Sequence, residues 1–134
     1  MANWIGTART NYFRVRDALE FREWAAQFEM VIFTDDAGRF GLYTASDNGG
    51  FPYMRKNGDE DEVLDVADEL SKLLADGSIA VLMEIGHVKN SYVSGFALAV
   101  NSLGKQVSVM LSDICGIAAA GFGVDPNTIS EARN

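Results

Sequence analysis

The stretch SIAVLMEIGHVKNSYVSGFALAVNSLGKQVSVML, residues 78–111, decides the fold. Residues 78–86 are apolar and rich in β-branched side chains, which predicts a central strand. Residues 94–102 and 106–111 predict two more strands, and the intervening NSLGK offers Gly104 for a short turn. Strands joined by a turn this short pair antiparallel, so this stretch predicts antiparallel strands within a sheet.

A hairpin is predicted further upstream. Residues 30–34 (MVIFT) and 39–44 (RFGLYT) have strand composition, and the turn residues DDAG lie between them. The glycine-rich segment that follows, residues 46–59 (SDNGGFPYMRKNGD), fits neither a helix nor a strand. We expect it to form the longest loop.

The N-terminal part predicts a strand followed by a helix. Residues 10–17 (TNYFRVRD) alternate apolar and polar side chains, as a strand with one buried face does. Asp17 has the position of a helix N-cap, and Glu20 three residues later completes a capping box. A helix is therefore expected over residues 18–28.

A second helix is predicted in the acidic stretch DEDEVLDVADELSKLLADG, residues 59–77. Asp59 has the position of its N-cap, Glu62 that of the capping-box partner, and Gly77 that of the residue after its C-terminus. The apolar residues recur at helical spacing and would form its buried stripe: Val63, Val66, Ala67, Leu70, Leu73 and Leu74.

A short third helix is expected after Ser112, which gives the element order β-α-β-β-α-β-β-β-α. Hairpins join most of these strands. The pattern predicts an α+β fold with a largely antiparallel sheet of five to six strands and two main helices on one face. A chain of 134 residues fits a single domain, residues 1–134, with a loosely held tail from about residue 124.

Composition limits the binding partners and the cellular compartment that can be expected. The net charge of −8 and the sequence pI of about 4.5 argue against direct binding of nucleic acid or of an anionic membrane. No signal peptide is visible, and the apolar runs are too short to cross a bilayer, so a cytoplasmic protein is expected. The single cysteine, Cys115, has apolar neighbours and is expected to be a buried thiol.

The sequence offers little catalytic chemistry. The lone histidine, His87, lies three residues after Glu84 and close to Tyr92, and these three would line the pocket if the protein were an enzyme. They fall short of any two-histidine metal motif, and no calcium loop or P-loop is present. We expect no catalytic residues, no metal and no cofactor.

The acidic stretch supports two interpretations. Eight of its nineteen residues are acidic and one is basic. On a helix, Asp61, Asp65, Asp68 and Glu69 would form a row that imitates a phosphate backbone and binds a Lys/Arg-lined groove of a partner protein. The alternative is an ordinary solvated face of an acidic protein.

The glycine-rich segment also supports two interpretations. Phe51, Tyr53 and Met54 are large apolar side chains of the kind that anchors interfaces. The same residues could instead fold back as a lid on the core. An antiparallel sheet with an apolar edge can pair with a second copy, so a homodimer is open as well.

Several motifs resemble a family of small, uncharacterised proteins carried on bacterial plasmids and integrative conjugative elements. Its members begin with Thr/Ser-Asn-Tyr-Phe-x-Val-x-Asp, followed by a strand ending in glutamate and glycine, a Tyr-x-x-Gly turn and an Ala-Val-Asn-Ser-x-Gly hairpin. These motifs correspond here to Thr10–Asp17, Glu84 and Gly86, Tyr92 and Gly95, and Ala99–Gly104.

The resemblance implies a setting and no reaction. Small accessory proteins of mobile elements often inhibit host defence, as anti-CRISPR and antirestriction proteins do, and several of them are acidic mimics of nucleic acid. The prediction is thus a non-catalytic inhibitor that binds a host protein at its nucleic-acid-binding surface. The alternatives are a regulatory or structural accessory protein that binds through residues 46–58, and a small enzyme.

Overall fold

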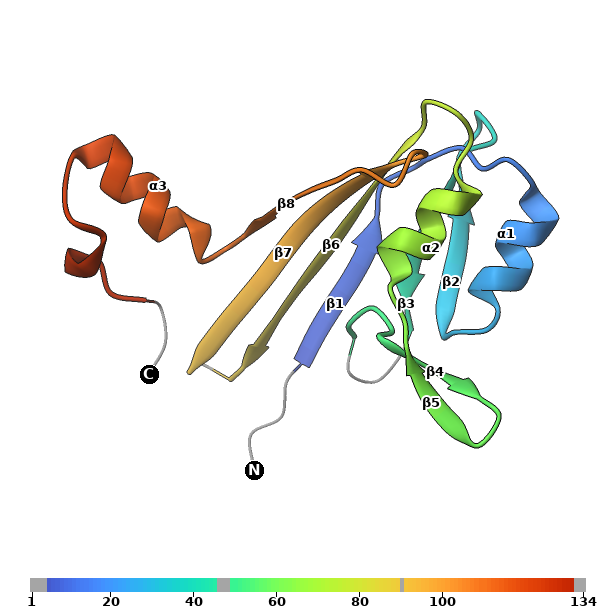
Figure 1. Cartoon of the computed structure of the whole chain (residues 1–134), viewed down its shortest axis with the longest axis horizontal. Helices are drawn as coiled ribbons and strands as arrows, with labels where there is room; N and C mark the ends of the chain where they lie inside the picture. Colours follow the sequence, from blue (N-terminus) through green and yellow to red (C-terminus); the bar gives the residue numbers. More distant parts are fainter. Residues whose placement is uncertain (1–4, 46–48, 90, 132–134) are drawn as a thin grey trace.

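The computed structural model describes residues 5–45, 49–89 and 91–131 and has the expected α+β fold. One antiparallel sheet has the strand order β2-β3-β1-β6-β7-β8 (Figure 1). Its strands are β1 Ile5–Thr10, β2 Met30–Thr34, β3 Phe40–Thr44, β6 Ile79–Val88, β7 Tyr92–Asn101 and β8 Gln106–Met110. A separate two-stranded hairpin consists of β4 Met54–Asn57 and β5 Glu60–Val63.

The helices differ in how they pack. Their bounds are α1 Ala18–Ala25, α2 Val66–Leu73, α3 Asp113–Phe122 and a short 3₁₀ helix, η1, Pro126–Thr128. Residues from α1 and α2 join one core with side chains from the sheet, which confirms two helices on one face. Helix α3 lies at the opposite end of the molecule from α1 (Figure 1).

The core forms where α1 and α2 meet the sheet. Phe21 and Leu70, the central residues of the two helices, have no exposed surface, and neither has Leu42 of β3. Phe13 and Phe21 pack edge to face, with ring centroids 5.7 Å apart. The aromatic residues of the N-terminal third therefore hold α1 against the sheet.

The predicted start of α1 is confirmed. Asp17 is the N-cap, and its Oδ1 accepts hydrogen bonds from the backbone N–H groups of Leu19 and Glu20 at 2.9 and 3.1 Å. The helix ends at Ala25, before the predicted end near Phe28. The predicted hairpin is also confirmed, because β2 and β3 pair directly around the DDAG turn.

The prediction of a first strand over residues 10–17 is wrong. The strand β1 lies earlier, and residues 11–17 make only isolated bridges, Phe13 with Phe40 and Val15 with Leu74. The backbone of this segment bonds in turn to β6, to β3 and to the end of α2. Apolar and polar residues alternate here because one side of the segment is buried, with Phe13 only 1% exposed. The segment has no continuous strand partner.

The boundaries predicted for the acidic helix are also wrong. Asn57 pairs with Glu60 across a two-residue turn in which Gly58 has a φ of 67°, so this part is a hairpin. Helix α2 begins after Asp65, which is its N-cap. Val63, predicted to be in the buried stripe, is 83% exposed on β5.

Two smaller expectations near the C-terminus need correction. Ser112 precedes α3 as predicted, but its side chain makes no capping hydrogen bond. Cys115 is half-buried, because α3 packs on little of the protein, whereas a buried thiol was expected. The start of the predicted loop, 46–48, and the end of the predicted tail, 132–134, lie outside the described residues.

Candidate functional site

The structure separates the residues considered for catalysis. Along β6, Ala80 and Leu82 are buried under the helices, so Glu84 points to the same side of the sheet. His87 has the opposite parity and points to the other side. Glu84 accepts a hydrogen bond from the backbone N–H of Phe51, with its Oε1 2.7 Å from the nitrogen. Glu84 therefore holds a loop in place and shares no pocket with His87.

That loop, residues 49–53, is tied to the sheet at its start. Gly49 is buried with a φ of 77°, and an added Cβ would lie 1.6 Å from the backbone oxygen of Gly6. Its own carbonyl accepts a hydrogen bond from the Thr44 hydroxyl at 2.6 Å. Only glycine fits this position, since both the backbone angle and the close approach exclude a side chain.

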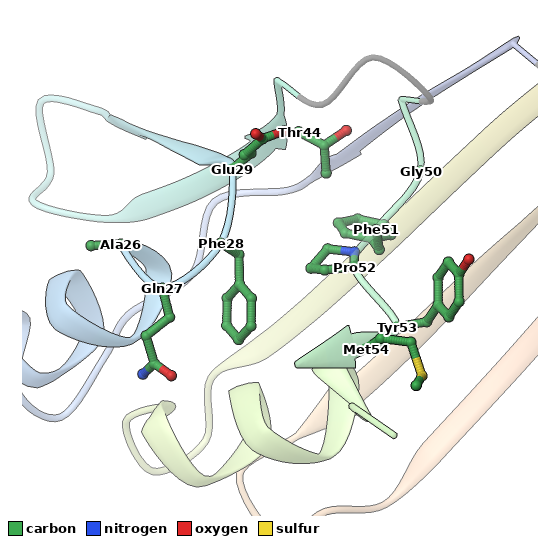
Figure 2. A pocket seen from close by; sticks show the side chains of 10 residues that line it. All are labelled: Ala26, Gln27, Phe28, Glu29, Thr44, Gly50, Phe51, Pro52, Tyr53 and Met54. Atoms are coloured by element: carbon green, nitrogen blue, oxygen red, sulfur yellow. The ribbon is translucent and has the colours of Figure 1, made fainter. Parts of the chain in front are cut away.

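The loop divides the surface between the sheet and the helices into two hollows. Phe51, Pro52 and Tyr53 line both of them. The smaller hollow, about 460 Å³, lies between the loop and the segment after α1. Figure 2 shows Phe28 on the far side of this hollow, with Tyr53 and Met54 projecting away from it.

The larger hollow, about 660 Å³, lies between the loop, the start of α2 and strands β6 and β7; we call it the loop groove. Its lining is mainly apolar, with the carboxylates of Asp65 and Glu84 as the charged groups. Two of its residues are strongly exposed at the rim, Tyr53 by 69% and Val63 by 83%. Small-molecule sites in proteins are likewise concave and mostly apolar, with a few polar groups.

The predicted row of acids does not lie on one helix. Asp61 is on β5, where its carboxylate pairs with Lys56 at 3.1 Å, and Asp65 caps α2 by accepting the N–H of Asp68 at 3.0 Å. Asp68 pairs with Lys72 at 3.4 Å along α2. The side chains of Asp61 and Asp68 are still 52% and 50% exposed, so both remain on the outer surface.

Glu69 has a different environment. Both of its oxygens bind the guanidinium of Arg55, at 2.9 and 3.0 Å, and one oxygen also accepts the indole N–H of Trp24 at 3.0 Å. Arg55 reaches Glu62 as well, at 2.8 Å. The hydrogen bonds to Glu69, followed by those to Glu62, raise the pKa of Arg55 above its ordinary value.

Two acidic residues that the sequence did not assign to the contact surface lie at the tip of the β4–β5 hairpin, where both are exposed: Asp59, which was wrongly predicted to be a helix N-cap, and Glu60. The Asn57-Gly58 pair was the signal that could have placed them there. We call the exposed acids of the hairpin and α2 the acidic surface: Asp59, Glu60, Asp61, Asp65 and Asp68. It adjoins the loop groove, because Asp65 and Val63 line that groove.

The large residues of the glycine-rich segment differ in burial. Phe51 is half-buried and packs against the core, as a lid would. Tyr53 is 69% exposed. Within the described parts of the chain, no three His, Cys, Asp or Glu side chains form a metal-binding group, and no helix is long and apolar enough to span a membrane.

No protein-family model, curated protein or solved structure matches this chain. The resemblance to proteins of mobile elements therefore rests on its sequence motifs alone.

Proposed function

We propose that this protein acts without catalysis, by binding a partner protein that carries a basic, nucleic-acid-binding surface. The observation that carries the proposal is the position of the loop groove beside the acidic surface. A partner could insert an apolar side chain into the groove while its Lys and Arg side chains meet the carboxylates around it. Such a contact combines a buried anchor with a charged rim.

The distribution of charge supports this proposal. Residues 54–76 hold eight acidic and three basic side chains, a large share of the net charge of −8. Lys56 and Lys72 screen Asp61 and Asp68 only partly, because these pairs are solvent-exposed. Glu69 is excluded from the contact surface, since Arg55 and Trp24 already bind it.

The resemblance to mobile-element proteins adds a biological setting to the proposal. The protein would inhibit host defence, of the anti-CRISPR or antirestriction type, by occupying the groove through which a defence protein binds nucleic acid. The alternative is an accessory protein of a mobile element that binds mainly through the loop. Tyr53, which is 69% exposed, is the observation that favours this alternative.

A pull-down with matched variants tests the proposal. The tagged protein is incubated with lysate of a bacterium that has CRISPR and restriction systems, and the retained proteins are identified by mass spectrometry. The test variant carries Asp59→Asn, Glu60→Gln and Asp61→Asn. The control variant removes the same charge elsewhere, with Glu20→Gln, Glu23→Gln and Asp36→Asn, which are exposed on α1 and the β2–β3 turn.

We expect wild type and the control variant to retain a nucleic-acid-binding protein that the test variant loses. Added double-stranded DNA or raised salt should release it, because DNA competes for its basic groove and salt screens surface charges beyond about 8 Å at physiological ionic strength. Retention by the test variant together with loss in Tyr53→Ala would favour the loop alternative. Retention that neither salt nor DNA affects would contradict the proposed surface.

A further inference from the structure

The face of the sheet opposite α1 and α2 is uncovered in the described residues and largely apolar, with the exposed Arg9 of β1 beside Met83; we call it the open face. Successive side chains of a strand point to opposite faces of the sheet. Leu82 of β6 and Val100 of β7 point into the core, so the odd-numbered residues of these strands point to the open face. Its large apolar residues on β6, β7 and β8 are 48% to 73% exposed: Ile79, Met83, Ile85, Val93, Val107 and Val109.

Helix α3 is apolar as well, and it is hardly covered. From Ile114 to Gly123 the sequence ICGIAAAGFG has no charged side chain. Ile114, Ile117 and Phe122 are 60% to 79% exposed, and Ala119 is the buried residue of the helix. A helix that is apolar on all sides is normally buried, and a ten-residue helix is marginally stable without packing partners.

The chain holds α3 away from its own open face. The backbone N–H of Leu111 bonds to the carbonyl of Gly95 at 3.0 Å, and that of Met110 bonds to the Asp113 carboxylate at 2.6 Å. These bonds set the direction in which α3 leaves β8, and the helix continues beyond the end of the strand (Figure 1). Another polypeptide is therefore better placed than the same chain to contact α3.

Charge does not oppose a second copy of this chain at the open face. Two molecules with a net charge of −8 repel each other, and a contact between surfaces without acids keeps this repulsion low. The open face meets this condition: the six residues above carry no charge, and Asp113, the one acid in residues 104–124, bonds to the backbone of Met110. The acidic surface lies on the hairpin and α2, on the covered side of the sheet.

The open face also has a hollow that a side chain of α3 could enter. A shallow hollow of about 500 Å³ on the open face is lined by Ile5, Ile85, His87 and Val93, among others. Phe122, which is 79% exposed on α3, is a side chain of suitable size and polarity for it. A stable interface needs about 800 Å² from each partner, and in this arrangement the open face and α3 of each copy would supply it together.

We propose that a second copy of this chain covers the open face, with α3 of each copy lying across the open face of the other. The assembly is a closed, two-fold dimer in which each chain supplies one arm and one receiving face. Dimer formation would bury both apolar surfaces, which explains why so acidic a chain keeps them apolar. The acidic surface and the loop groove stay free on the outside of the dimer.

Light scattering after size-exclusion chromatography tests the dimer. Wild type should have twice the mass of the 14.6 kDa chain at micromolar concentration. Met83→Asp on the open face and Ile117→Asp on α3 should each shift it to a monomer. Leu19→Asp, at a 66% exposed site on α1, is the matched control and should leave the dimer intact. Circular dichroism verifies that each variant is folded.

Mixing the two variants tests the exchange of α3. The Met83→Asp chain keeps an intact arm, and the Ile117→Asp chain keeps an intact receiving face, so a mixed dimer regains one of the two arm–face contacts. We expect the mixture to associate where each variant alone does not. A wild-type monomer, or a dimer that neither variant disrupts, would overturn the proposal. Disruption by both variants without rescue in the mixture would overturn the exchange.

Discussion

Arg55 and Glu69 face each other in a bidentate ion pair, with Nη1 and Nη2 2.9 and 3.0 Å from the two carboxylate oxygens. The pair attaches the β4–β5 hairpin to α2. Because Trp24 of α1 donates to the same carboxylate, one side chain connects three elements. The hairpin has few other contacts with the body of the protein, so the position of its acids Asp59, Glu60 and Asp61 depends on this pair.

Arg55→Lys should loosen the hairpin. Lysine keeps the positive charge but cannot bind both carboxylate oxygens in one plane. We expect faster hydrogen–deuterium exchange over residues 54–63, measured by mass spectrometry, with unchanged exchange in β6 and β7. Lys56→Gln removes an exposed partner of Asp61 and serves as the control, which should exchange like wild type. Equal exchange in both variants would contradict the role of the ion pair.

Thr10→Val should destabilise the fold, although valine has nearly the same shape as threonine. Thr10 is 2% exposed, and its hydroxyl accepts the N–H of Leu42 at 2.9 Å and donates to the carbonyl of Asn11 at 2.8 Å. Valine leaves a buried N–H without a partner, which costs about 1–3 kcal/mol of unfolding free energy. Urea unfolding measures the loss. Thr34→Val, at an exposed strand end, should change stability little; equal effects would refute this explanation.

Gly49→Ala should displace the loop that separates the two hollows. A Cβ at this position would lie 1.6 Å from the backbone oxygen of Gly6, so the backbone must move. We expect a loss of more than about 1 kcal/mol in thermal unfolding. Gly38 has the same φ of 77° with nothing within 4 Å, so Gly38→Ala isolates the backbone strain. Equal losses of stability in Gly49→Ala and Gly38→Ala would show that the close approach of Gly49 to Gly6 does not matter.

Asp35 should make the β2–β3 turn sensitive to acid. Hydrogen bonds from the Arg39 backbone and side chain, and from the Ala37 backbone, lower the pKa of this carboxyl below its ordinary value of 3.8. A carboxyl whose pKa is lower in the folded state stabilises the protein above its unfolded pKa. This stability disappears as the pH falls through the folded pKa.

Asp35→Asn should therefore lower the melting temperature at neutral pH. The difference from wild type should shrink as the pH falls below 3.8. Asp36→Asn, on the neighbouring exposed residue, is the control and should show no such trend. A difference for Asp35→Asn that stays constant down to strongly acidic pH would show that the lost hydrogen bonds do not depend on the ionised carboxyl.

Local patterns in the sequence were sufficient for most of the architecture. Short connections between apolar strands predicted an antiparallel sheet, and β6, β7 and β8 pair in that way. Asp17 predicted the start of α1 because an N-cap acts only on the adjacent backbone. The acidic helix was placed too early since its carboxylates resembled a capping box, while the Asn57-Gly58 turn signal was overlooked.

The candidate site depended far more on contacts between distant residues. The spacing of Asp61, Asp65, Asp68 and Glu69 suggested one row, but Glu69 bonds to Trp24, 45 residues away, and its side chain is only 24% exposed. Phe51 is positioned by Glu84, 33 residues away, which makes Glu84 a support for the loop. No pattern along the chain encodes these partners.

The sequence by itself determined the fold class, strands β2, β3, β6, β7 and β8 of the sheet, and the excess of acid in residues 59–77, because all three follow from neighbouring residues and from composition. Tertiary structure decided which carboxylates stay exposed, where the loop groove lies and which face of the sheet lacks a cover. Those properties arise when distant segments meet. The ion pair with Arg55 leaves the Glu69 side chain only 24% exposed, whereas α3, directed away from the sheet, leaves Met83 and its neighbours in contact with water.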